Sequence, residues 1–96
     1  MNITLGQVVF SKAGRDAGRI FIVTKIIDAM YVLISDGDLR KIEKPKKKKI
    51  KHLEITGIVI DSISEKLNKG FKVSNSEIRK ALAAVGAGSN AKIKGE

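Results

Sequence analysis

The sequence predicts a mainly β protein, in which a small five-stranded barrel is followed by two short helices. Two observations predict this class. In the first half, short runs rich in valine and isoleucine alternate with glycine and aspartate, as is typical of antiparallel strands with tight connections. In the second half, apolar residues recur at helical spacing. Closing the strands into a barrel would remove the exposed edges of the sheet. A three-stranded sheet with loose ends is the alternative.

Three strands are predicted from apolar runs that end at polar or glycine residues. They cover residues 8–10, 20–27 and 31–34. The third is closed by Asp36-Gly37, a strong turn signal because glycine accepts a positive φ. Two further strands are predicted with less apolar content, at residues 39–44 before Pro45 and at residues 52–55.

Two helices are predicted from capping signals and apolar spacing. The first covers about residues 60–69, where Ser62 and Glu65 have the spacing of a capping box and Gly70 suits the C-terminal cap. The second begins at a Ser74–Glu77 capping box and is expected to stop at Gly86. Its apolar residues lie along one face, with Arg79 and Lys80 on the side away from it.

These elements divide the chain into three parts. Residues 1–56 are predicted to form the barrel domain and residues 57–86 a helical extension. Residues 87–96 (AGSNAKIKGE) have little apolar content and are expected to be a flexible tail.

Composition limits the classes of function. The chain has 96 residues, 43% of them hydrophobic, with a formal net charge of +9 and no cysteine. The length fits one small domain, and disulfides and thiolate metal sites are excluded. No apolar run approaches a membrane span, and the start of the chain lacks signal-peptide features, so a cytoplasmic location is expected. The basic balance favours an anionic partner.

Most of that charge lies in one segment. Arg40–Lys51 (RKIEKPKKKKIK) holds eight basic residues and one acid, a net charge of +7. Lys46–Lys49 cannot all lie on one face of a strand, so a loop that reaches outward is expected. Such a run favours sequence-independent contact with a phosphate backbone. A solvated loop without a partner is the alternative, and a membrane-surface role is weaker because no amphipathic anchor accompanies the run.

The segment GQVVFSKAGRDAGRIFIVTKIID resembles the KOW motif of ribosomal proteins and transcription elongation factors. In that motif a basic loop containing glycine joins two strands, and Gly18 matches its central glycine. Glycine lets the chain reverse and leaves room for a ligand to approach. Arg15 and Arg19 flank the reversal, and their guanidinium groups suit phosphate geometry. Asp16 is expected to order the loop through its own backbone or by pairing with Arg15 or Arg19.

Over residues 1–56 the order of strand, loop, strand, DG turn and LRKIEKPKKKKIKHLE resembles the SH3-like barrel of ribosomal proteins of the L14e, L6e and L27e type, and most of all their small bacterial KOW relatives. The resemblance implies an SH3-like five-stranded barrel of KOW type and an RNA-binding, ribosome-associated role. It does not extend to residues 57–96.

The candidate RNA-binding residues come from the KOW-like loop and the basic segment. They are Lys12, Gly14, Arg15, Gly18, Arg19, Arg40, Lys41, Lys44, Lys46, Lys47, Lys48, Lys49, Lys51 and His52. His52 is the only histidine, so the serines have no other plausible base and no metal-ligand cluster is visible. We therefore expect no enzyme activity, no cofactor and no metal.

The sequence thus predicts a non-enzymatic module that binds structured RNA, and the resemblance points to ribosomal RNA and to neighbouring ribosomal proteins. Structured RNA is read mostly through phosphates and 2′-hydroxyls. The few aromatic residues (Phe10, Phe21, Tyr31 and Phe71) are expected in the core, which disfavours binding of single strands by stacking. The alternative is a protein–protein adaptor. The oligomeric state is left open, and no helix carries a convincing set of base-reading side chains for DNA.

Overall fold

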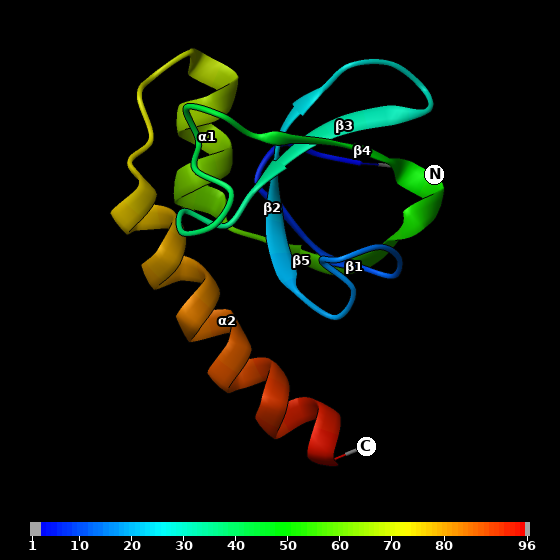
Figure 1. Ribbon diagram of the computed structural model, residues 1–96. Helices are drawn as coiled ribbons and strands as arrows, with labels where there is room; N and C mark the ends of the chain where they lie inside the picture. Colours follow the sequence, from blue (N-terminus) through cyan, green and yellow to red (C-terminus); the bar gives the residue numbers. More distant parts are fainter. Residues whose placement is uncertain (1–2, 96) are drawn as a thin grey trace.

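The computed structural model describes residues 3–95, with side chains up to residue 86. Five strands precede two helices, as predicted (Figure 1). The elements are β1 (Gln7–Ser11), β2 (Ile20–Ile26), β3 (Tyr31–Ser35), β4 (Lys46–Lys49), the one-turn 3₁₀ helix η1 (Ile50–His52), β5 (Leu53–Val59), α1 (Asp61–Lys69) and α2 (Asn75–Gly95). Within the described residues, neither helix is long and apolar enough to cross a membrane.

The strands form one antiparallel sheet in the order β4-β3-β2-β1-β5. Its two edges, β4 and β5, are separated in the chain only by the three residues of η1. The sheet must therefore curl strongly to bring its edges near each other, as Figure 1 shows. No strand pairing joins the edges within residues 3–95, so the predicted closure into a barrel is wrong. The chain turns through η1 there, and the sheet stays open.

Two register shifts help to curl the sheet. One lies between Val23 and Lys25 in the pairing of β2 with β3, and the other between Gln7 and Val9 in the pairing of β1 with β5. Extra residues in one strand bend it and increase its twist. The Thr56 hydroxyl, in β5, donates a 2.6 Å hydrogen bond to the Val8 carbonyl across the second shift.

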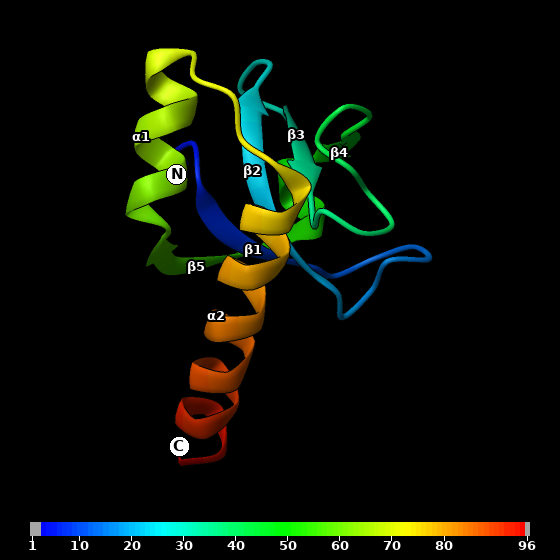
Figure 2. The same ribbon diagram turned by 90° about the vertical axis from the view of Figure 1, so that its left-hand side faces the viewer.

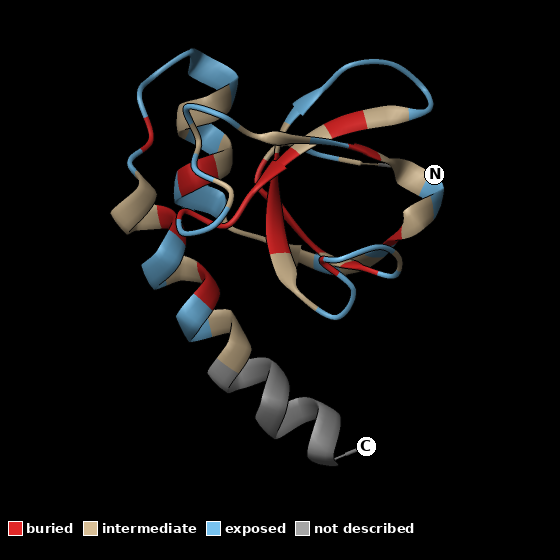
Figure 3. Ribbon diagram, viewed as in Figure 1, coloured by how far each residue is buried: buried red, intermediate tan, exposed pale blue. Residues whose placement is uncertain are grey.

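Both faces of the central strands are buried (Figure 3). Val9, Phe21 and Val23 pack inside the curl, whereas their neighbours Val8 and Ile22 belong to an outer core that the helices cover. Continuous apolar runs are the expected sequence of strands buried on both sides. The inner core also contains Val32, Ile34 and Leu53, and the outer core Ile63, Val73, Ile78 and Leu82.

The aromatic residues are divided between core and surface. Phe21 is fully buried, and Phe10 and Tyr31 are half-buried. Phe71 is 61% exposed, so its predicted place in the core is wrong. It follows the Gly70 cap in the link between the two helices and belongs to neither core, whereas Val73 of the same link packs in the outer core.

Two of the predicted strand assignments need correction. Residues 39–44 are not a strand but part of a loop, residues 36–45, that joins β3 to β4. The lysine run, expected as a loop, is strand β4, in which Lys49 pairs with Tyr31 and Lys46 with Ile34. The backbone of the run pairs with β3 and completes its hydrogen-bond ladder. The stabilisation from this pairing does not depend on apolar side chains. The fifth strand is confirmed but runs further, to Val59.

Two of the four predicted helix signals are confirmed. Gly70 caps α1 with a φ of 76°. The Ser74–Glu77 capping box is present, since the Glu77 amide donates to Ser74 Oγ and the Ser74 amide to Glu77 Oε2. The box at Ser62 is wrong, because α1 already begins after Ile60.

The stop at Gly86 is also wrong, because α2 continues to Gly95 through most of the segment expected as a tail. Glu96 lies outside the described residues, and the flexibility of the tail stays a prediction.

The helical part packs closely on the sheet. A Cβ on Gly6 would lie 2.8 Å from the Ser64 backbone, and one on Gly37 would meet the Asn75 carbonyl oxygen at the start of α2. Asn75 Oδ1 also accepts a 2.8 Å hydrogen bond from the Ile42 amide. The shared outer core crosses the predicted boundary at residue 56, and the division of the chain into a barrel domain and a helical extension stays a prediction.

Candidate nucleic-acid interface

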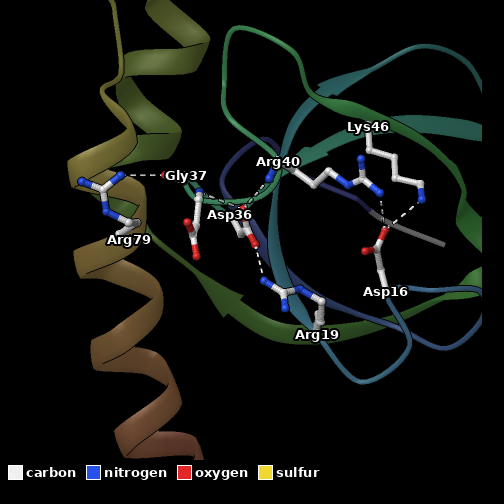
Figure 4. A network of polar contacts seen from close by, with 8 residues as sticks. Asp16, Arg19, Asp36, Gly37, Arg40, Lys46 and Arg79 are labelled. Atoms are coloured by element: carbon white, nitrogen blue, oxygen red, sulfur yellow. Dashed lines mark hydrogen bonds and ion pairs between the residues drawn. The ribbon is translucent and has the colours of Figure 1, made fainter.

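The two basic segments, far apart in sequence, are in direct contact. Asp16, at the tip of the KOW-like loop, accepts hydrogen bonds from Lys46 Nζ at 2.9 Å and Arg40 Nη2 at 3.3 Å (Figure 4). Lys48 Nζ donates to the Ala13 carbonyl at 3.0 Å. In Figure 2 the loops of residues 12–19 and 36–45 extend to the same side of the molecule, away from α1. The structure therefore brings the two segments together as one basic region.

Strand alternation divides the four lysines of β4. Lys46 and Lys48 pair with Ile34 and Val32, whose side chains belong to the inner core. Directly opposed residues share a face of a sheet, so these two lysines lie on the inner face. Lys48 is only 8% exposed. Their amines donate hydrogen bonds to the KOW-like loop across the open end of the curl. These two lysines therefore stabilise the fold.

The other two lysines of β4 lie on the outer face. Lys47 pairs with Leu33 and Lys49 with Tyr31. Lys47 Nζ lies 4.5 Å from the centroid of the Tyr31 ring, a cation–π contact that holds the charge without neutralising it. The expectation that the lysines could not share one face of a strand is confirmed, although the inferred loop is wrong.

Asp36 organises the loop between β3 and β4. Its Oδ1 accepts the backbone amides of Asp38 and Arg40 at 2.9 and 2.8 Å, and its Oδ2 accepts Arg19 Nη2 at 3.0 Å. Arg79 on α2 donates to the Gly37 carbonyl at 2.7 Å, so it contacts the loop of residues 36–45 instead of lying on the far side of its helix. The sequence signalled the turn at Asp36-Gly37 but not these long-range partners.

Both buried aspartates are held as anions. A hydrogen bond from Lys46, with the nearby charges of Lys46 and Arg40, outweighs burial and lowers the pKa of Asp16 below its ordinary value. Burial alone would raise the pKa of Asp36. The amides of Arg40 and Asp38 and the guanidinium of Arg19 reverse that effect and lower it. Asp16 therefore pairs with Lys46 and Arg40, and the predicted pairing with Arg15 or Arg19 is wrong.

Gly18 reverses the KOW-like loop as predicted. Its φ is 84°, and its amide donates to the Ser11 carbonyl at 2.8 Å. Gly14 also has a positive φ, of 80°. A Cβ on Gly18 would meet nothing within 4 Å, so the space beside it is open. His52, expected in a strand, ends η1, and its carbonyl accepts the Lys12 amide.

The predicted basic residues thus fall into two sets. The paired set (Arg19, Arg40, Lys46 and Lys48) is engaged within the fold. The free set has no ion pair or side-chain hydrogen bond within the described part of the chain and consists of Lys12, Arg15, Lys41, Lys44, Lys47, Lys49 and Lys51. In the same part of the chain, no three histidine or carboxylate side chains gather to hold a metal ion.

The curled sheet and its free cations define a small basic β protein with a surface suited to a polyanion. No family model matches the chain. Curated proteins match it. The chain is 32% identical to the large ribosomal subunit protein eL14 of Staphylothermus marinus over 84 residues, which are 88% of this chain and 80% of the relative. The corresponding identity to eL14 of Desulfurococcus amylolyticus is 36%, with the same coverage.

A bacterial relative matches as well. The chain is 30% identical over 71 residues to the Bacillus subtilis protein named "Putative ribosome-binding protein YbzG", which is 74% of this chain and 96% of the relative. Each of these matches covers more than two thirds of this chain and more than two thirds of the relative. The chain belongs to the eL14 family, and the predicted resemblance to the L14e type is confirmed.

Proposed function

We propose that this protein is a non-enzymatic component of the ribosome or a factor that associates with it, and that it binds the phosphate backbone of structured ribosomal RNA. The observation that carries the proposal is the division of the basic residues: the fold uses the paired set and leaves the free set without an ion pair among the described residues. The names of the relatives, a ribosomal protein and a ribosome-binding protein, support the same setting.

The chemistry of the free set fits backbone contact better than base reading. It consists almost wholly of lysines, which act as mobile point charges, and the single arginine is Arg15. Neutralising phosphates with such groups releases condensed counterions, which favours binding irrespective of sequence. Structured RNA is read largely in this way. A cytoplasmic location with the ribosome follows from the same proposal.

We further infer that the curled sheet is an open form of the SH3-like barrel of KOW type. Its support is the short η1 link between the two edge strands and the reversal at Gly18 within the loop that carries the KOW resemblance. In this form the KOW-like loop and β4 provide the two sides of the RNA contact.

Affinity for a folded ribosomal RNA fragment, measured against salt concentration, tests the proposal. Each neutralised phosphate contributes about −0.7 to −0.9 to the slope of log affinity on log salt, so we expect a slope of about −3 or steeper. The variant Lys12→Glu/Arg15→Glu should flatten the slope and weaken binding about tenfold or more.

The matched control is Lys72→Glu/Lys80→Glu, which makes the same change in net charge on exposed residues of the helical part. We expect it to leave the slope nearly unchanged. Equal effects of the two variants would show attraction by net charge alone, and a flat slope for the unmodified protein would rule out the phosphate-backbone interface.

A further inference from the structure

The hairpin between β2 and β3 exposes apolar side chains that neither core uses. Ile26, Ile27 and Met30 are 42%, 41% and 58% exposed. The other exposed large hydrophobic residues of the described chain, Leu39 and Phe71, lie in other segments. Figures 1 and 2 both show the hairpin turn at the top of the molecule, whereas the KOW-like loop lies lower down. The RNA interface proposed above does not require these side chains.

The hairpin turn is held in place, so its apolar side chains are not exposed by disorder of the loop. Asp28 Oδ1 accepts the amides of Met30 and Tyr31, both at 2.8 Å. The Ile50 amide of η1 donates to the Met30 carbonyl at 2.8 Å, which ties the turn to the neighbouring edge of the sheet. A contact surface fixed in advance costs less entropy on binding than a mobile one.

Two adjoining hollows lie between the turn and η1. The first, of about 240 Å³, is lined by Ala29, Met30, Ile50 and the lysines Lys49 and Lys51. The second shares Ala29 and Ile50 with it and adds Ile3, Ile26 and Asp28. The floor is thus mainly aliphatic, and two free cations stand at its rim. The one acid, Asp28, is engaged with the backbone of the turn.

We propose that this apolar tip is a docking site for a protein segment that presents an apolar side chain flanked by aspartate or glutamate. The rim lysines supply the charge complementarity for an acidic partner, and they oppose contact with a second copy of this basic chain. An unstacked base fits less well, because the lining offers no aromatic platform and few groups to bond its edges. The tip adds a protein contact beyond the proposed RNA contact.

Selection from a displayed library of random peptides on the immobilised protein tests the proposal. We expect enriched peptides to carry a large apolar residue beside acidic ones. A synthetic peptide of the enriched sequence should bind Met30→Asp about tenfold more weakly, the effect of losing a central anchor. Lys49→Gln/Lys51→Gln should weaken binding several-fold and reduce its salt dependence.

The matched control is Leu39→Asp, which puts the same charge on a leucine that is 64% exposed in another loop and should leave peptide affinity unchanged. Met30→Gln provides a neutral variant should Met30→Asp unfold. Failure to enrich acidic peptides, or equal binding by Met30→Asp and the unmodified protein, would overturn the proposal.

Two further measurements separate other occupants. If Met30→Asp lost affinity for the folded RNA fragment and not for the peptide, the tip would be a base pocket. If it lost binding to vesicles of phosphatidylserine and phosphatidylcholine and not to the peptide, the tip would be a membrane contact. Either result would overturn the docking proposal and leave the test of the proposed RNA interface, by salt slope and loop variants, unaffected.

Discussion

The two faces of β4 carry the same residue type and have different roles. On the inner face, Lys46 and Lys48 bond to Asp16 and to the Ala13 carbonyl across the open end of the sheet. On the outer face, Lys47 and Lys49 have no ion pair among the described residues. The comparison shows that the charge of a basic run does not measure its capacity for a polyanion. Register with β3 decides which lysines stabilise the fold and which remain free to bind.

The largest effect should come from reversing the inner pair. In Lys46→Glu/Lys48→Glu, one new carboxylate faces Asp16 and the other faces a carbonyl in a nearly buried position. Uncompensated buried charge costs about 3–5 kcal/mol of unfolding free energy. Urea unfolding followed by circular dichroism measures this. A loss below about 1 kcal/mol would show that the inner lysines are not needed for stability.

Reversing the outer pair should give the opposite pattern. Lys47→Glu/Lys49→Glu alters the same strand and the net charge equally, so it is the matched control for the inner pair. We expect unfolding free energy to change by less than about 0.5 kcal/mol. Affinity for folded ribosomal RNA should fall about tenfold or more, with a slope on salt flatter by about 1 to 2. Equal loss of stability in both variants would contradict the division of β4 into two faces.

The contrast between β4 and the apolar strands explains how much of the fold was predictable from the sequence. β1, β2 and β3 were found because both of their faces are apolar, and the Ser74 start of α2 because its capping signal is local. An all-lysine strand has no apolar signal, and its place in the sheet depends on a ladder with β3 that local pattern does not reveal. The closed barrel was predicted from the number of strands, and strand number alone does not decide whether the two edge strands pair.

The sequence identified the basic residues of the candidate site but not the pairs that they form within the fold. Each predicted basic residue lies in one of the two contacting segments, yet the sequence could not show which residues the fold engages. Arg19 finds Asp36, and Arg40 finds Asp16. These pairs join loops that are distant in the sequence and depend on how far the sheet curls. The one local signal was Asp36-Gly37, where an aspartate precedes a glycine with a positive φ.

Two glycines allow a smaller test of how the loops are fixed. Gly37 and Gly18 have similar φ values of 78° and 84°, but only at Gly37 would a Cβ collide with another element, the Asn75 carbonyl of α2. Gly18→Ala should cost about 1 kcal/mol from backbone strain alone. Gly37→Ala should cost at least about 2 kcal/mol, because overpacking adds to the strain. Thermal or urea unfolding of both variants measures the difference. Equal costs would show that the loop of residues 36–45 is not fixed against α2.

The smallest expected effect concerns Asp16 and acid. Its pKa is lowered in the folded protein by Lys46 and Arg40, so its contribution is complete above the unfolded value of about 3.9 and is lost as pH falls through the folded pKa. Asp16→Asn should therefore cost about 1 kcal/mol at neutral pH, since both cationic partners are partly exposed and can reach water.

The difference in unfolding free energy between Asp16→Asn and the unmodified protein should shrink below about pH 4. Asp36, whose pKa is also lowered, keeps the variant sensitive to acid, so the difference between the two proteins is the quantity to follow. Asp38→Asn, at an exposed aspartate without an ion pair in the described residues, is the matched control and should show no such convergence. A difference that stayed constant to about pH 3 would mean that Asp16 acts through shape and hydrogen bonding instead of its charge. The inner lysines would then stabilise the fold without an ion pair, and the contrast between the two faces of β4 would be one of burial alone.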